Sequence, residues 1–251
     1  MKNTHFWSRI FLFLWSVFLL NGTAFGQAQE SNGWGSVWQE RMTIGQASLD
    51  EAFKIAQKGN VGEALSIIDK VIASSPNNWR AYFLKAAVLT MAKRQAEALQ
   101  QIDVSIRLAR RSNVSAALLS ELYQSRGRSC LDFGRYGDAK HSLEAAAHLQ
   151  PADPTTLNDL AWMLATCEDG RVRDGRRAVN IATKACKLSN WSNAYALDTL
   201  AAASAEAGQF NDAVKYQQWA INRLEPEDRK LQLSAMEERL RLYQSGKPFR
   251  G

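Results

Sequence analysis

Alanine recurs along this chain at intervals close to 34 residues. Five alanines, Ala64, Ala98, Ala139, Ala178 and Ala213, are separated by 34, 41, 39 and 35 residues, a period of 34 with insertions of seven, five and one. Most residues four and seven positions after each alanine are apolar or small. Offsets of 0, 4 and 7 lie on one face of an α-helix, so the pattern predicts a row of similar helical units.

Glycines and prolines mark where these helices end. Gly59, Gly134 and Gly208 stand five residues before three of the alanines, and Pro76 and Pro151 stand twelve residues after two of them. Glycine adopts the left-handed conformation that ends a helix, and proline disfavours continuation of the helix before it. Each unit is therefore predicted to be a helix A, a short turn and a helix B, with the alanine where the two helices approach closely.

Two units carry this order of small and aromatic residues most completely: Gly127, Gly134, Tyr136 and Ala139 in the third, and Ala201, Gly208, Phe210 and Ala213 in the fifth. The order resembles the tetratricopeptide repeat (TPR) family across residues 45–227. The resemblance implies an all-α, TPR-type solenoid of antiparallel helix pairs with a C-terminal capping helix, eleven helices in all. The five predicted repeats span residues 45–78, 79–112, 120–153, 154–193 and 194–227, followed by a capping helix and tail over 228–251.

Three segments depart from the regular period. Residues 113–119 are expected to lengthen helix A of the third unit, with Asn113 and Ser115 as helix caps. Residues 168–175 are charged, contain two glycines and are expected to form a loop. In the capping helix, predicted from Arg229 to Gln244, Leu231 is expected to cover the last repeat and Arg239 to face water.

The first 26 residues have the pattern of a secretory signal. Lys2 and Arg9 precede an apolar run of 11 residues from Ile10 to Leu20, and Ala24 and Gly26 are small residues before a cleavage point. The run is short for a membrane span, which needs about 20 residues, although retention of the segment as an anchor stays open. We therefore expect export to the periplasm or cell envelope, with residues 27–44 forming a flexible N-terminal arm.

Charge and cysteines limit the alternatives. The chain has 31 Lys and Arg against 25 Asp and Glu, a mild excess, and export disfavours a nucleic acid partner. A disulfide between Cys167 and Cys186 or between Cys130 and Cys167 is disfavoured by the expected helix geometry, so three buried thiols are the preferred interpretation. His141 and His148 lie seven residues apart, about 10 Å along a helix, which is too far for one metal ion without further ligands.

The residues indicate no catalytic set, no metal site and no cofactor. The TPR resemblance instead implies a concave face, lined by helix A residues, that binds a protein or peptide. The predicted partner-binding residues are Arg80, Phe83, Gln124, Arg128, Asn158, Trp162, Tyr195 and Asp198. Arg128 and Trp162 occupy equivalent positions 34 residues apart and are expected to be neighbours, with the cation beside the aromatic ring.

The predicted function is a monomeric, non-catalytic scaffold or adaptor of the bacterial envelope that binds a peptide or a partner helix. The alternative is a cell-wall or carbohydrate-associated accessory factor, favoured by the expected location and by the aromatic side chains of helix A. The identity of the partner is not predicted.

Overall fold

The computed structural model describes the backbone of residues 34–251 and the side chains of residues 45–251. All regular structure in this part of the chain is helical, with eleven helices and no strand, as predicted. The predicted secretory signal and the first part of the predicted arm lie outside the described residues.

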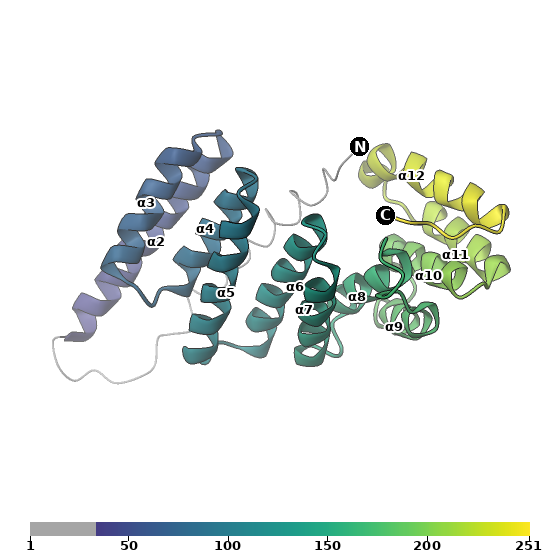
Figure 1. Ribbon diagram of the computed structural model, residues 1–251, viewed down its shortest axis with the longest axis horizontal. Coiled ribbons are helices and arrows are strands. Elements are labelled where there is room, and N and C mark those ends of the chain that lie inside the picture. Colours follow the sequence, from purple (N-terminus) through teal and green to yellow (C-terminus); the bar gives the residue numbers. More distant parts are fainter. Residues whose placement is uncertain (1–33) are drawn as a thin grey trace. The chain divides into compact units, whose positions relative to one another are not determined.

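The chain divides into two compact units, the first ending at Leu118 and the second beginning at Leu119. Each unit consists of helices that are neighbours in sequence and pack side by side (Figure 1). The first unit contains α2 (Trp34–Gln57), α3 (Val61–Ser74), α4 (Trp79–Met91) and α5 (Gln95–Arg111). The second contains nearly all of α6 (Ala116–Asp132), then α7 (Tyr136–Leu149), α8 (Pro154–Thr166), α9 (Gly175–Leu188), α10 (Ala194–Glu206), α11 (Phe210–Asn222) and α12 (Pro226–Gln244).

The five periodic alanines lie where the helices of each pair cross. All five are completely buried. The third pair shows how closely the helices approach, because a Cβ atom added to Gly127 on α6 would lie 2.8 Å from Cγ of Leu143 on α7. A larger side chain at such a contact would force the two helices apart, which explains why small residues recur there.

The turns between paired helices use the left-handed conformation. Gly59, Gly134 and Gly208 have φ angles of +89°, +69° and +79°, as their positions in the sequence predict. In the second pair the equivalent residue is Lys93, which adopts the same conformation with φ of 59° although it carries a side chain. The turn geometry is therefore kept even where glycine is absent.

Two predicted irregular segments have helical parts. Helix α2 begins at Trp34, so the second part of the segment that we predicted as a flexible arm is helical.

Ser115 caps the long helix α6, because its Oγ accepts a hydrogen bond of 3.2 Å from the Leu118 amide. Asn113 instead ends α5, with φ of 49°, and does not cap α6. Residues 168–175 form the predicted loop up to Asp174, and Gly175 is the first residue of α9.

The last helix, α12, packs against α11 and also contacts α10. Tyr243 on α12 is buried, but two predictions for this helix are wrong. Leu231 is 64% exposed, and Arg239 is only 8% exposed. Gly246, with φ of +69°, then turns the chain away from the helix, and residues 247–251, which we call the tail, run back toward α8 (Figure 1).

Candidate functional site

Six of the eight predicted partner-binding residues lie on the A helices of the second unit. Gln124 and Arg128 are on α6, Asn158 and Trp162 on α8, and Tyr195 and Asp198 on α10. Helix α10 packs against α8, and polar contacts join α8 to α6. We call the surface formed by these residues of α6, α8 and α10 the A-helix face.

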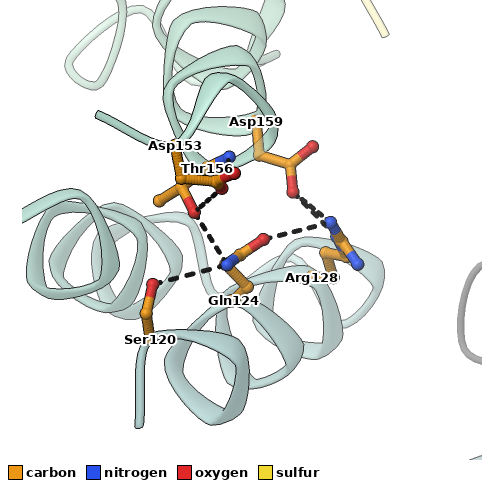
Figure 2. A network of polar contacts seen from close by, with 6 residues as sticks. All are labelled: Ser120, Gln124, Arg128, Asp153, Thr156 and Asp159. Atoms are coloured by element: carbon orange, nitrogen blue, oxygen red, sulfur yellow. Dashed lines mark hydrogen bonds and ion pairs between the residues drawn. The ribbon is translucent and has the colours of Figure 1, made fainter. Parts of the chain in front are cut away.

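A chain of hydrogen bonds connects α6 with the start of α8, and Figure 2 shows its six residues. Gln124 Nε2 donates to Thr156 Oγ1 at 2.8 Å and to Ser120 Oγ at 3.4 Å. Asp153 caps α8, because its Oδ2 accepts from the Thr156 amide at 2.7 Å and also from the Thr156 hydroxyl. Gln124, a predicted residue of the A-helix face, therefore belongs to a network that fixes one repeat against the next.

Arg128 extends this network from Gln124 to Asp159. Its Nε donates to Asp159 Oδ2 at 3.0 Å and its Nη2 contacts the same oxygen (Figure 2). Nη2 also lies 3.5 Å from Gln124 Oε1. The prediction that Arg128 is the cation beside Trp162 is wrong, since an aspartate one turn earlier on α8 holds the guanidinium.

An acidic pair lies beside the network. Glu121 on α6 is half-buried, and its burial, together with the negative charge of Asp153, raises its pKa to about 7. Asp153 is occupied as the cap of α8. The ionised form of Glu121 is therefore disfavoured at this end of the A-helix face.

Trp162 lies at the centre of a second cluster, made by α8, α12 and the tail. The guanidinium carbon of Arg239 lies 5.5 Å from the centre of the Trp162 ring. The Phe249 ring is 5.9 Å from the Trp162 ring, with a tilt of 42°, and 5.5 Å from the Arg239 guanidinium. Among the described residues the cation over Trp162 is thus Arg239, which comes from the capping helix.

Asp198 is already paired within the chain. Its Oδ1 accepts from Arg239 Nε at 2.9 Å and from Gln217 Nε2 at 2.8 Å, and its Oδ2 accepts from Arg239 Nη2 at 2.8 Å. Asp198 as a whole residue is only 5% exposed. Asp198 therefore joins α10 to α11 and α12, and its predicted contact with a partner would require these bonds to break.

The tail is held at the ends of α8 and α10. Arg250 Nη2 lies 2.6 Å from Glu206 Oε2, and the Gly251 amide donates to the Thr166 carbonyl at 3.1 Å. The other carboxylate oxygen of Glu206 accepts from Arg173 Nε at 2.9 Å. Arg173 also donates to the carbonyls of Cys167 and Glu168, so it fixes the loop after α8 beside the tail.

The remaining predicted residues have different surroundings. Arg80 and Phe83 are on α4 in the first unit, where Phe83 is buried and the Arg80 guanidinium lies 4.5 Å from the ring centre of Trp79. Burial lowers the pKa of Arg80. On the A-helix face, Tyr195 is half-buried. Asn158 Oδ1 is buried and accepts no hydrogen bond from the described part of the chain.

Sequence reasoning missed five residues that surround the predicted ones: Asp159, Glu206, Arg239, Phe249 and Arg250. None of them stands at a periodic small position, so the repeat pattern gives no signal for them. The cluster of basic residues from Arg239 to Arg250 was the available signal, but a basic cluster is more often solvated surface.

A separate aromatic cluster lies on α11 and the loop between α9 and α10. The rings of Trp191 and Tyr216 are stacked with centres 6.3 Å apart, and Tyr216 meets Trp219 edge-on at 5.9 Å. Trp191 has φ of 57°, an unusual conformation for a large side chain. Lys215 lies 5.0 Å from the Trp219 ring centre, so a cation accompanies this partly exposed aromatic surface.

The described residues contain no group of three or more His, Cys, Asp or Glu side chains placed to hold a metal ion. Cys130, Cys167 and Cys186 are buried thiols, and burial raises the pKa of Cys186 to about 12. No helix among residues 34–251 is long and apolar enough to cross a membrane.

Comparison with known proteins agrees with this architecture. Residues 56–113 match the model of the tetratricopeptide repeat family. No curated protein is significantly similar to this chain in sequence.

Solved structures with the same fold are distant in sequence. MamA is 18% identical, with a TM-score of 0.57 over 77% of this chain and 96% of MamA. YrrB, described as a TPR protein with an unusual peptide-binding site, is 16% identical, with a TM-score of 0.57 over 82% of this chain and 98% of YrrB. The pilF protein of Pseudomonas aeruginosa is 15% identical, with a TM-score of 0.59 over 81% of this chain and 90% of that protein. The chain thus matches the tetratricopeptide repeat family over residues 56–113, and its described helices have the fold of these solved structures.

Proposed function

We propose that this chain is a non-catalytic protein-interaction scaffold of the bacterial envelope, and that it binds a peptide or a partner helix on the A-helix face. One observation carries the proposal. The A-helix face at α8 and α10 holds a non-helical segment, the tail, through an aromatic contact, an ion pair and a main-chain hydrogen bond. Aromatic anchors, ion pairs and main-chain hydrogen bonds are interactions by which protein surfaces hold peptide segments.

The chemistry of the face supports the same conclusion. Aromatic side chains that are half-buried, such as Trp162 and Tyr195, supply apolar area with little loss of conformational freedom. Polar groups on the same face, such as the half-buried side chain of Asn158, supply orientation. A mixed surface of this kind suits a partner that contributes both apolar anchors and hydrogen-bond donors. The fold also supports the proposal, since repeat proteins generally use extended surfaces for binding.

The envelope location rests on the sequence of the first 26 residues, with its basic start and short apolar run. These residues lie outside the described structure. A protein exported in this way would meet periplasmic or cell-wall partners.

The test is capture of partners from an envelope extract by immobilised protein, with the retained proteins identified by mass spectrometry. Trp162→Ala and Arg128→Ala are compared with wild type at equal folded concentration, established by circular dichroism. His141→Ala, an exposed change on α7, is the control. We expect at least one specific protein to be retained by wild type and by the control and to be reduced with both A-helix variants. Retention that is unchanged in both variants would place the binding surface elsewhere.

The carbohydrate alternative makes a different prediction in the same assay. A glycan ligand would depend on an aromatic platform and would tolerate loss of Arg80. Purified cell-wall glycan added as a competitor should then release the retained material, whereas a bound protein partner should be unaffected.

A further inference from the structure

The tail occupies the A-helix face with three consecutive residues that each meet a different kind of group. Phe249 meets the Trp162 ring, Arg250 meets the Glu206 carboxylate and the Gly251 amide meets the Thr166 carbonyl. The three receiving groups come from α8 and α10, and the tail comes from beyond α12. The contacts therefore define the chemistry that this part of the face accepts.

The first position is selective for an aromatic ring. The Phe249 ring contacts both the Trp162 ring, at 5.9 Å between centres, and the Arg239 guanidinium, at 5.5 Å, and these two groups also contact each other. Asp198 holds this guanidinium in place by two hydrogen bonds. An aliphatic side chain would fill the space but would lose both the ring–ring and the cation–π contributions.

The second position is selective for a cation with several donors. Glu206 is mostly buried, and Arg173 already uses its Oε1. Its Oε2 faces Arg250 at 2.6 Å. A buried carboxylate oxygen without a donor is costly, so this oxygen favours an incoming guanidinium or ammonium group.

The third position fixes the register of the main chain. Thr166 is the last residue of α8, and its carbonyl is among those that have no partner within the helix. A Cβ atom added to Gly251 would lie 2.7 Å from Cζ of Phe249. The residue that donates to the Thr166 carbonyl is therefore best a glycine.

We propose that the surface formed by Trp162, Thr166 and Glu206 binds a segment of a partner protein in which an aromatic residue is followed by arginine and glycine. The tail is the intramolecular competitor of that segment. This proposal rests on the scaffold function proposed above and specifies the partner for one part of the A-helix face.

The energetics of competition follow from the connection between the tail and α12. A segment joined by a short linker has an effective concentration in the millimolar range. Consider a partner segment that binds the open surface with micromolar affinity. Its apparent affinity is reduced in proportion to the fraction of molecules whose surface is open. Removing the tail contacts should consequently strengthen binding in trans by at least tenfold.

The experiment uses a fluorescein-labelled peptide with the sequence of residues 247–251, Lys-Pro-Phe-Arg-Gly, and measures fluorescence anisotropy. Three full-length proteins are titrated: wild type, Phe249→Ala/Arg250→Ala, and the same double variant with Glu206→Gln. We expect saturable binding to the double variant, at least tenfold weaker binding to wild type, and loss of about tenfold in affinity with Glu206→Gln, because the ion pair between arginine and Glu206 is lost. Arg250→Ala alone serves as a second open form if the double variant does not fold.

Peptide controls test the assigned chemistry. Alanine in place of phenylalanine, arginine or glycine should each weaken binding to the double variant. Equal binding of all four peptides would overturn the proposal, as would the absence of saturable binding to a folded double variant. A tail that serves only as a structural cap would lower stability when substituted and give no binding in trans. Concentration-dependent dimers of wild type in light scattering would instead show exchange of tails between copies and would also overturn it.

The experiments distinguish failure of this inference from failure of the proposed scaffold function. If a partner is captured from the envelope extract and its capture is unchanged by Phe249→Ala/Arg250→Ala, the scaffold function stands and this inference is wrong. If the labelled peptide binds as expected and no envelope protein depends on the A-helix face, the inferred chemistry stands and the scaffold function fails.

Discussion

Arg239 and Asp198 form a buried, bidentate ion pair that joins the capping helix α12 to α10, helix A of the fifth repeat. Arg239 Nε and Nη2 donate to the two carboxylate oxygens of Asp198 at 2.9 Å and 2.8 Å. Since the side chains are only 9% and 7% exposed, each charge depends on the other. The pair also orients the guanidinium that contacts Trp162 and Phe249.

Arg239→Met should lower the free energy of unfolding by about 3–5 kcal/mol, because it leaves the buried Asp198 carboxylate without its cation. The double variant Arg239→Met/Asp198→Asn should recover at least half of that loss, since the uncompensated charge is then gone. Urea unfolding followed by circular dichroism measures both. Arg241→Met, an exposed change on the same helix, should be close to wild type. Equal losses for the Arg239 and Arg241 variants would contradict the structure.

Ala139→Leu should destabilise the protein by about 1–3 kcal/mol, because the added atoms overfill the completely buried crossing of α6 and α7. Ala73→Leu, an exposed change on the B helix α3, is the matched control and should have little effect. Thermal unfolding of the two variants tests the assignment. A wild-type midpoint for Ala139→Leu would mean that the alanine period does not mark the helix crossings.

Lys93→Gly should stabilise the first unit by about 1 kcal/mol, because Lys93 adopts a left-handed conformation that costs a non-glycine residue about that much. The three equivalent glycines already avoid this cost. The control is Lys58→Gly, because Lys58 precedes Gly59 in the turn between α2 and α3 and has no positive φ angle. This change should not stabilise the protein. The comparison is made by urea unfolding, and a destabilised Lys93→Gly would show that the side chain contributes more than the strain removes.

Glu121 makes stability depend on pH. Its pKa is raised to about 7 in the folded protein by burial and by Asp153, above an unfolded value of about 4.3. Between these two values the folded state binds more protons than the unfolded state, so the stabilisation present at low pH is lost as pH rises through about 7.

Glu121→Gln should remove that loss. We expect the variant to be more stable than wild type at pH 8, with a smaller difference at pH 5, in unfolding curves recorded at both values. Glu238→Gln, an exposed change on α12, should show no such contrast. A difference between Glu121→Gln and wild type that is the same at both pH values would exclude this carboxyl group as the source.

Export should remove the first 26 residues by cleavage near Gly26–Gln27, because a basic start and a short apolar run precede the small residues Ala24 and Gly26. N-terminal sequencing of protein recovered from the periplasm measures the cleavage point. Recovery of a soluble protein that still begins at Met1 would contradict the predicted signal.

The sequence by itself determined the repeat architecture. The positions of Ala139, Gly134 and their equivalents require small side chains at helix crossings or a left-handed turn, and both requirements depend on residues close together in the chain. The same local rules predicted the loop after α8 and the cap at Ser115.

Only the tertiary structure decided how the A-helix face is occupied. Arg239 meets Asp198 across 41 residues of sequence, Arg128 meets Asp159 across 31, and Phe249 reaches Trp162 from beyond the last helix. These pairings depend on the path of α12 and on the turn at Gly246, which no periodic pattern records. A charged side chain is expected in water unless a partner buries with it, and that partner is known only once the chain is folded.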